Sequence, residues 1–445
     1  MKLLHVSDIH FGIENYSRID PVTGLPTRLQ DFVAAFDRAI DRGLEAGVDA
    51  VLFTGDAYKN RDPNPTVQRE FAKRIMRLVH HKVPVFLLTG NHDLPNMSTR
   101  AHSIEIFETL AVPGVYVARG IELFKIPTKS GLLQIVSLPW LTRQNLITRE
   151  EYRGRSLEEL NQLLLEKMEN LLKQQLKQLD PQYPAVLAVH ASIVGATYGS
   201  ERSIMLGQDL ALQKSILGAE NFDYIAVGHI HKHQDLRAGD TSIVYPGSLE
   251  RIDFGEENDP KGFILVEIDD PGGGRITRLT NWHFIEDPLV RPFRTLDLNI
   301  EDIDEDSLLN PTSAAVQAIQ REAARLKGPG LQNAIVRVRL KLRPDQLAGL
   351  REDELRRTLN EYDIYHLAGV ERKVDRPRRV RLGGASVEGL SPLQLLEKYL
   401  ETKNVRPDRV ELLLKHAHTL IHGAVPENPV PEAPTKVEST LIPVE

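Results

Sequence analysis

The feature that most constrains the fold is an alternation of short apolar runs with helical patterns over the first 285 residues or so. Such alternation is typical of α/β domains, in which helices cover the faces of a sheet. We therefore expect an α/β domain over residues 1–285. Its predicted strands are KLLHV, DAVLFT, VPVFLLT, LQIVSL, PAVLAV, DYIAV, SIVY and GFILVEI.

Three long helices are expected in the same domain, because their apolar residues recur every three or four positions. They are DFVAAFDRAIDRGLEAG, TVQREFAKRIMRLVHH and SLEELNQLLLEKMENLLKQQLKQL. The third begins with Ser156 as N-cap and Glu159 three residues later, which predicts a capping box. Its leucine stripe has two interpretations, packing on a sheet or forming a dimer seam, and the first is the more common use of such a stripe.

The pattern of predicted elements changes after residue 285. Residues 286–384 contain a helical stretch (Thr312–Lys327), an alternating strand (VRVRLKL), a second helical stretch (Pro344–Asn360) and the basic run ERKVDRPRRVRL. This order predicts a small α+β second domain.

Two amphipathic helices are expected in residues 385–424, at SPLQLLEKYLETKN and PDRVELLLKHAHTLI. They either pack on their own domain or enter a groove of a partner. The last residues, 425–445, are rich in proline without periodicity and are expected to be disordered.

Composition excludes several kinds of protein. A length of 445 residues predicts two or three domains, and the lack of cysteine excludes disulfides and thiolate metal sites. Asp8 and His10 come too early for a secretory signal, and no run of 18 apolar residues exists, so we expect a cytoplasmic protein outside membranes. The net charge of −7 gives no overall attraction to nucleic acid, so DNA binding would require a local basic patch.

Five of the predicted strands end in side chains that can bind a metal, within SDIH, TGD, TGNHD, a single histidine and GHIH. Residues two apart on a strand point to one face, and the carboxyl edge of a sheet is where α/β proteins build their sites. We therefore expect these side chains to converge at one edge. They are Asp8, His10, Asp56, Asn91, His190, His229 and His231.

Seven nitrogen and oxygen ligands are too many for one catalytic zinc, but they suit two ions that share a carboxylate. We assign Asp8, His10, Asp56 and His231 to one ion, and Asp56, Asn91, His190 and His229 to the other, with Asp56 as the bridge. Mixed imidazole, carboxylate and amide ligands favour manganese, iron or zinc over magnesium or calcium. Two ions about 3.5–4 Å apart can hold a hydroxide and clamp both oxygens of a phosphoryl displacement.

His92 follows ligand Asn91 and is expected to face the substrate phosphate, where it would stabilise charge or protonate the leaving oxygen. Asp93 is expected to orient His92. Glycines before three of the ligands would let the backbone turn sharply. We interpret His233 as a solvated or supporting ring and His5 as a core histidine with satisfied hydrogen bonds.

The ordered set DIH, GD, GNHD, single His and GHIH resembles the calcineurin-like metallophosphoesterases, which form a four-layer α/β/β/α sandwich. Over roughly residues 1–422 the chain is similar to the SbcD-type DNA repair exonucleases. The segment YPGSLERIDFGEE, a capping domain beyond residue 286 and the two late helices support this narrower resemblance.

The resemblance implies a manganese-dependent nuclease that works as a homodimer with the ATPase SbcC. It also implies exonuclease action on double-stranded ends and endonuclease action on single strands and hairpins. Dimerisation would use helices at about 66–80 and 98–111, and the late helices would dock on the coiled-coil base of SbcC. One departure is Lys59, which stands where many relatives have a histidine, and it leaves the balance of the two activities open.

Several alternatives remain at this point. The run RKVDRPRRVR is either a solvated face or a surface for DNA phosphates or a partner. The rival functions are a small-substrate phosphatase or cyclic-nucleotide phosphodiesterase on the same fold, and a scaffold that binds DNA ends. The candidate DNA contacts are Lys59, Arg376, Arg378, Arg379 and Arg381.

Overall fold

The protein forms two compact units, Met1–Lys373 and Val374–Glu445. In the part of the chain that the structure describes, no helix is long and apolar enough to cross a membrane. The computed structural model describes residues 1–95, 100–142, 154–199, 210–270, 277–301, 310–326, 330–374, 391–403 and 405–422.

The first sheet of the larger unit has six strands, in the order β12-β11-β1-β2-β3-β4. Strands β1 to β4 run parallel, β11 pairs antiparallel with β1, and β12 pairs antiparallel with β11 at the edge. The bounds are β1 Lys2–Val6, β2 Ala50–Phe53, β3 Val85–Leu88, β4 Val115–Ala118, β11 Gly262–Asp269 and β12 Leu279–Glu286.

The second sheet also has six strands, in the order β5-β6-β7-β8-β10-β9. Its four inner strands are parallel, and β5 and β9 pair antiparallel at the two edges. The bounds are β5 Leu123–Thr128, β6 Gly131–Leu138, β7 Ala185–His190, β8 Tyr224–Gly228, β9 Gln234–Asp235 and β10 Ile243–Tyr245.

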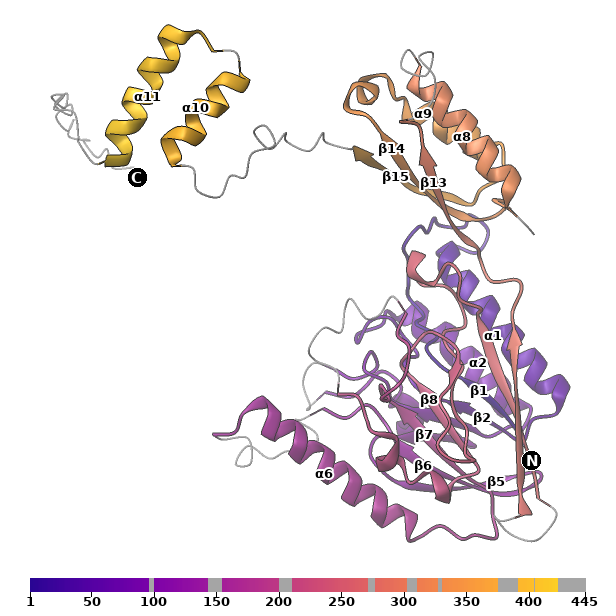
Figure 1. Ribbon diagram of the computed structural model, residues 1–445. Coiled ribbons are helices and arrows are strands. Elements are labelled where there is room, and N and C mark those ends of the chain that lie inside the picture. Colours follow the sequence, from indigo (N-terminus) through magenta and orange to yellow (C-terminus); the bar gives the residue numbers. More distant parts are fainter. Residues whose placement is uncertain are drawn as a thin grey trace, which may run out of the picture. The chain divides into compact units, whose positions relative to one another are not determined.

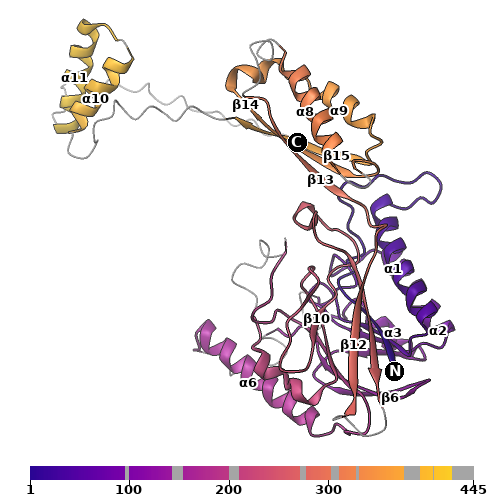
Figure 2. The ribbon, with the colours of Figure 1, turned by 45° about the vertical axis from the view of Figure 1, so that its right-hand side comes forward.

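Three apolar cores hold helices and sheets together as four layers (Figures 1 and 2). Helices α1 (Thr27–Ala46) and α2 (Pro65–His80) cover the outer face of the first sheet through Phe36 and Phe71. Helix α6 (Leu157–Leu176) covers the outer face of the second sheet, and the third core lies between the sheets. The expected α/β/β/α sandwich is therefore confirmed.

The leucine stripe of α6 packs on the second sheet, as its first interpretation required. Its buried side chains include Leu160, Leu164 and Leu172. The predicted capping box is also present, because Ser156 accepts from the Glu159 N–H and the Glu159 carboxylate accepts from the Ser156 N–H.

Beyond the sandwich, residues 293–374 form a smaller layer of three strands and two helices, which we call the accessory layer. Its sheet has the order β13-β14-β15, and α8 and α9 lie on the same side of it (Figure 1). The bounds are β13 Phe293–Asn299, α8 Pro311–Arg325, β14 Ile335–Leu342, α9 Glu352–Asn360 and β15 His366–Val374.

The single helix expected over Pro344–Asn360 is wrong, because it is two elements. A 3₁₀ helix, η6 (Pro344–Gly349), is separated from α9 by two extended residues. The Thr312 hydroxyl donates to the carbonyl of Gly349 at 2.8 Å and accepts from the Arg351 N–H at 2.9 Å. These contacts with α8 replace the hydrogen bonds that a continuous helix would have made at this point.

A polar junction joins the accessory layer to the sandwich. The Arg291 guanidinium donates to both carboxylate oxygens of Asp31 at 2.6 Å and lies 3.7 Å from the ring centroid of Tyr365. Tyr16, in the loop before α1, contacts the rings of Phe254, Phe293 and His366. This junction fixes the accessory layer beside the loops that follow β1 and β10.

The smaller unit contains the two expected amphipathic helices, α10 (Pro392–Thr402) and α11 (Pro407–His422). In the stretch 98–111, the described residues include only the four-residue helix α3 (Ile106–Thr109). Residues 375–390, which hold Arg376, Arg378, Arg379 and Arg381, and residues 423–445 lie outside the described part of the chain.

Candidate metal centre

The structure brings the seven predicted ligands together at one end of the sandwich. Three of the five strands that lead to them, β1, β2 and β3, belong to the first sheet, and β7 and β8 belong to the second. The expectation of a single sheet edge is therefore replaced by a site between the carboxyl ends of two facing sheets. This arrangement surrounds the site with side chains from two directions.

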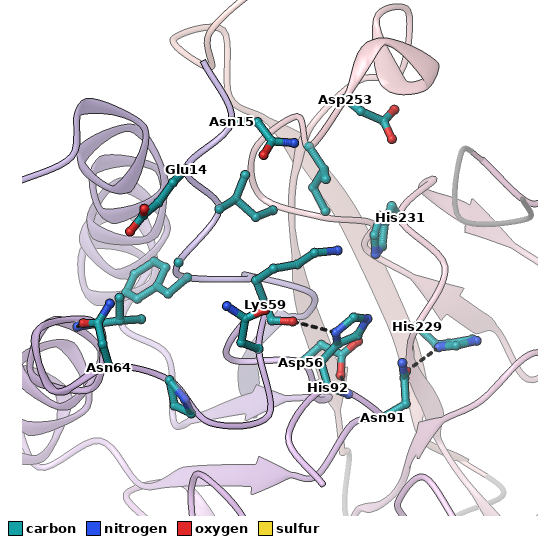
Figure 3. Close-up of a pocket in the computed structure, with 17 residues that line it drawn as sticks. Glu14, Asn15, Asp56, Lys59, Asn64, Asn91, His92, His229, His231 and Asp253 are labelled. Carbon is teal, nitrogen blue, oxygen red and sulfur yellow. Dashed lines mark hydrogen bonds between the residues drawn. The ribbon is translucent and has the colours of Figure 1, made fainter. Parts of the chain in front are cut away.

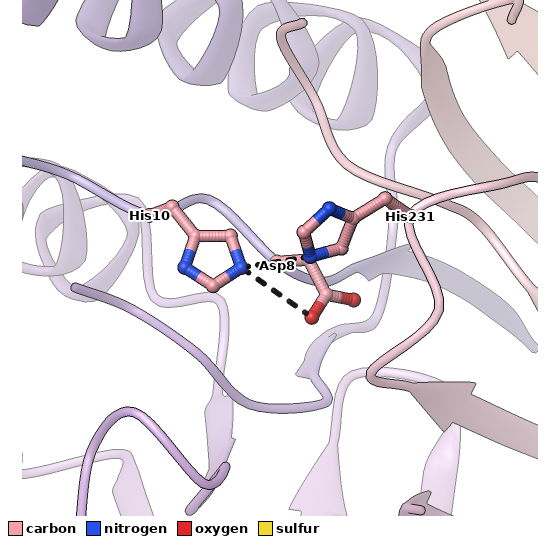
Figure 4. A group of neighbouring side chains, drawn as sticks. All are labelled: Asp8, His10 and His231. Atoms are coloured by element: carbon pink, nitrogen blue, oxygen red, sulfur yellow. Dashed lines mark hydrogen bonds and ion pairs between the residues drawn. The ribbon is translucent and has the colours of Figure 1, made fainter. Parts of the chain in front are cut away.

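The first ligand group contains Asp8, His10 and His231 (Figure 4). The Nε2 atoms of His10 and His231 lie 3.0 Å apart, and His10 Nε2 lies 3.9 Å from Asp8 Oδ1. All three side chains are buried. Two imidazole nitrogens and a carboxylate therefore face one small space.

The second group contains Asp56, His190 and His229, with Asn91 between the rings. The amide oxygen of Asn91 lies 3.1 Å from His190 Nε2 and 3.0 Å from His229 Nδ1, and the latter contact is visible in Figure 3. Asp56 Oδ2 lies 3.5 Å from His190 Nε2 and 3.7 Å from His10 Nε2. Asp56 thus stands between the two groups, where the sequence placed a bridging carboxylate.

The buried ligands influence one another's protonation, so metal binding at this site is coupled to proton release. Burial alone would raise the pKa of Asp56, but electrostatic interaction with His190 and His92 holds that pKa well below its usual range. Burial lowers the pKa of His10 well below its usual value. For His190, burial opposes the charged form, but the Asp56 carboxylate raises the pKa to about 9. An ion bound beside His190 must therefore displace a proton from that ring.

The backbone of the ligand loops adopts conformations that are rare for residues with a side chain. Asp8, His10 and Asp56 have φ values of 51°, 51° and 59°, and His229 has 102°. Such conformations cost about 1–3 kcal/mol each and persist only where the surrounding structure imposes them. Gly90 allows the close approach of two loops, because a Cβ there would lie 2.1 Å from Asp56 Oδ1.

His92 lies beside the ligands but has a different partner from the one predicted. Its ring Nδ1 lies 2.8 Å from the backbone carbonyl of Lys59 (Figure 3), and its backbone N–H donates to Asp56 Oδ1 at 2.8 Å. The ring also lies close enough to His10 and Asp56 for the three side chains to bind one cation together. The carbonyl of Lys59 therefore orients the imidazole.

The expectation that Asp93 orients His92 is wrong. The Asp93 carboxylate accepts from the backbone N–H groups of Asp56, Ala57 and Gly90 at 2.9–3.0 Å. Burial, together with the charge of Asp56, raises the pKa of Asp93 to about 7. Asp93 thus ties together the loops after β2 and β3, which carry Asp56 and Asn91.

The ligands open into a pocket of about 670 Å³, a volume within the usual range for ligand sites. The predicted residues His92 and Lys59 lie on its wall (Figure 3). Most of the other polar side chains around it are uncharged amides. The polar residues that line it beyond the ligands are Glu14, Asn15, Lys59, Asn60, Asn64, His92 and Asp253.

Three residues near the centre were not anticipated from the sequence. The ring of Trp140, which follows β6, lies 4.8 Å from that of His229. Glu256 and Lys261 form a buried pair beside His231. Trp140 comes two residues after the predicted strand LQIVSL, and this position at a strand end was the signal that could have identified it. A buried charge pair has no signature in the sequence.

His233 lies outside the ligand groups, and His5 is a core histidine with satisfied hydrogen bonds, as interpreted from the sequence. His233 stacks on Phe284 with ring centroids 4.1 Å apart, and its Nδ1 lies 2.8 Å from the carbonyl oxygen of Tyr245. Among the described residues, no group of metal-competent side chains includes His233. The ring nitrogens of His5 lie 3.1 and 3.0 Å from the hydroxyl oxygens of Tyr224 and Thr54.

The donor set fits divalent transition ions. Imidazole nitrogens, carboxylates and one amide oxygen converge, and none of the ligands is a thiolate. The shared carboxylate of Asp56 gives two adjoining groups rather than one. The residues present therefore suit a pair of ions.

Comparison with known families matches residues 1–233 to the family described as Calcineurin-like phosphoesterase. Among curated proteins, the DNA double-strand break repair protein Mre11 of Archaeoglobus fulgidus is 26% identical over 281 residues, covering 60% of this chain and 57% of that protein. The Mre11 proteins of Thermoplasma acidophilum and Methanosarcina mazei are 26% and 23% identical over 61% and 68% of this chain. These matches cover 63% and 44% of the two relatives, so the chain spans only part of each of the three.

Proposed function

Because this chain belongs to the calcineurin-like phosphoesterase family, we propose that it is a metal-dependent DNA nuclease that hydrolyses phosphodiester bonds with two divalent ions. Its actions would be exonuclease cleavage at double-stranded ends and endonuclease cleavage of single strands and hairpins. It would act in DNA repair as the nuclease subunit of an SbcCD-type complex. The relatives named as DNA double-strand break repair proteins support this assignment.

The observation that carries the proposal is the position of Asp56. Its carboxylate lies 3.5 Å from His190 and 3.7 Å from His10, so it is shared by the two ligand groups. One carboxylate between two sets of donors is an arrangement that can hold a pair of ions close together. We propose manganese as the physiological ion, because the mixed donor set favours manganese, iron or zinc over magnesium.

The residues of the pocket supply the remaining parts of a hydrolysis. When bound, the two ions supply a water of lowered pKa and an electrostatic clamp on the phosphate oxygens. His92 is held through Nδ1 by the Lys59 carbonyl, which leaves its Nε2 edge to act on the substrate. A protonated His92 would donate from Nε2 to the leaving oxygen. The Lys59 ammonium would pair with a phosphate of the DNA as a point charge.

We further propose that residues 286–384 are a capping and DNA-binding domain and that residues 385–424 bind the ATPase. Several large apolar side chains of α10 and α11 are at least 40% exposed, which suits docking into a groove of a partner. A homodimer and DNA contacts by Arg376, Arg378, Arg379 and Arg381 belong to the same proposal. The exposed apolar residues are Tyr399, Leu412, Leu413, Leu420 and Ile421.

The test compares cleavage of end-labelled duplex DNA, hairpin DNA and a small chromogenic phosphodiester by the full chain in Mn²⁺. We expect cleavage of DNA that is abolished by EDTA and reduced at least about a hundredfold in Asp56→Asn, which removes the shared charge. Turnover of the small phosphodiester with no DNA cleavage would favour a small-substrate phosphodiesterase in this pocket of about 670 Å³. DNA binding without any turnover would favour an end-binding scaffold.

A further inference from the structure

A fully buried ion pair lies directly behind the first ligand group. Lys261 Nζ is 2.8 Å from Glu256 Oε2, and both side chains are 0% exposed. Burying such a pair is expensive in desolvation, and replacing one by apolar residues is often neutral or stabilising. Stability alone therefore does not account for this pair.

The second oxygen of Glu256 contacts a predicted metal ligand. Glu256 Oε1 lies 2.8 Å from Nδ1 of His231. An ionised carboxylate only accepts hydrogen bonds, so Nδ1 of His231 must carry the proton. The lone pair is then on Nε2, the nitrogen that faces His10 and the first ligand group.

Lys261 holds this carboxylate ionised and in place. Its ammonium lies 2.8 Å from Glu256 Oε2, so the carboxylate has a buried cation as its direct partner. The ammonium also donates to the carbonyl of His231 at 3.0 Å and to the hydroxyl of Ser248 at 2.8 Å. The Ile252 N–H donates to Glu256 Oε2 at 3.0 Å. The carboxylate thus has one fixed orientation.

We propose that Glu256 is a positioning residue that sets the tautomer and orientation of His231 and strengthens its binding of the first ion, and that Lys261 fixes Glu256 for this role. The inference rests on the proposed metal centre. Carboxylates behind ligating histidines raise the basicity of the ring, and their loss weakens metal binding about 10–100-fold.

The same turn offers a matched control. Glu256 ends the short helix η4 (Phe254–Glu256), and the next residue, Glu257, points toward the accessory layer. Glu257 accepts from the N–H and the hydroxyl of Thr295 at 2.8 and 2.7 Å. Two adjacent glutamates therefore serve different partners, and only one of them contacts a ligand.

The test titrates the metal-free full-length protein with Mn²⁺ by calorimetry and records the EPR spectrum of the Mn²⁺-loaded protein. For Glu256→Gln we expect one of the two ions to bind at least about tenfold more weakly. When less Mn²⁺ is added than both sites can bind, the EPR spectrum of this variant should be that of isolated Mn²⁺ and not that of a spin-coupled pair. Glu257→Gln should bind both ions as the wild type does.

In Glu256→Gln the buried Lys261 ammonium loses its carboxylate partner, and this loss by itself destabilises the protein. The double variant E256L/K261M removes both charges and therefore avoids this effect. Apolar residues replace the whole pair, so the metal-free protein should unfold at a temperature near that of the wild type. It should still bind one ion at least about tenfold more weakly, because Nδ1 of His231 has lost its acceptor. Wild-type affinities for both ions in E256Q or in E256L/K261M would overturn the role of Glu256. A wild type that binds no ion pair would instead overturn the proposed metal centre.

Discussion

The Nε2 atoms of His10 and His231 lie 3.0 Å apart, although 221 positions separate the two residues in the chain. They meet because β1 and β8, in different sheets, end at the same end of the sandwich. Two buried imidazoles at this distance cannot both be cations without strong repulsion. A site that holds them as neutral donors is suited to a metal ion.

Replacing His92 by alanine should separate catalysis from metal binding. The ring contacts the Lys59 carbonyl and faces the pocket, so its loss should reduce DNA cleavage about 10²–10⁴-fold, the usual contribution of a general acid. Cleavage rates in Mn²⁺ and calorimetric titration with Mn²⁺ measure the two properties. A loss of one bound ion in this variant would show that His92 is a ligand of its group with His10 and Asp56.

Lys59 should contribute one ionic contact to DNA. The variant Lys59→Ala keeps the backbone carbonyl that orients His92, so only the ammonium is lost. We expect the slope of log K against log salt for duplex binding to decrease by about one unit. Lys125→Ala, an exposed lysine of β5 outside the pocket, is the matched control and should keep the wild-type slope. An unchanged slope in Lys59→Ala would place the ammonium away from the phosphates.

Arg291 should stabilise the junction between the accessory layer and the sandwich. Arg291→Ala removes two short hydrogen bonds to a half-buried Asp31 and a cation–π contact with Tyr365. We expect the free energy of unfolding in urea to fall by about 2–4 kcal/mol. Arg325→Ala removes an exposed pair with Glu322 and should cost less than about 1 kcal/mol. Equal, small losses in both variants would contradict this role.

His5 should make the metal-free protein less stable in acid. Burial, assisted by His233, lowers the pKa of His5 from 6.5 to about 3, so between these values the unfolded chain binds a proton that the folded chain does not. Stability should therefore fall as the pH drops below about 6.5, and His5 should add up to about 1.4 kcal/mol per pH unit to that slope. Urea unfolding in EDTA between pH 7 and pH 4 measures it. His5→Gln should have a shallower slope than both the wild type and the exposed control His81→Gln, and identical slopes would contradict the prediction.

The sequence predicted the α/β layers and the convergence of the ligands because both depend on local patterns, whereas the four-layer sandwich was implied by the family resemblance. Apolar runs that end in Asp, Asn or His, two positions apart in SDIH and GHIH, mark the ends of strands, and parallel strands end together. The Ser156 capping box is equally local, and it was predicted correctly. The strands β4, β5, β9, β12, β13 and β15 were missed. Strand β4 is only half buried, β5 contains Pro127, β9 has two residues, and β12 is half polar.

The parts that the sequence did not predict depend on contacts between distant segments. Asp93 stands next to His92, which suggested a contact between them, but the fold turns its carboxylate toward the N–H groups of another loop. The pairing of Glu256 with Lys261 behind His231 likewise requires β11 to lie beside the turn after β10. Such partners follow from the three-dimensional fold and from no pattern in the chain.

The most direct test of the two-ion centre is the anomalous scattering of crystals grown with Mn²⁺ and measured above the manganese edge. The account predicts two peaks about 3.5–4 Å apart with Asp56 between them, one beside Asp8, His10 and His231 and the other beside Asn91, His190 and His229. A single peak, or none, in crystals grown at a saturating concentration of Mn²⁺ would contradict the two-ion centre.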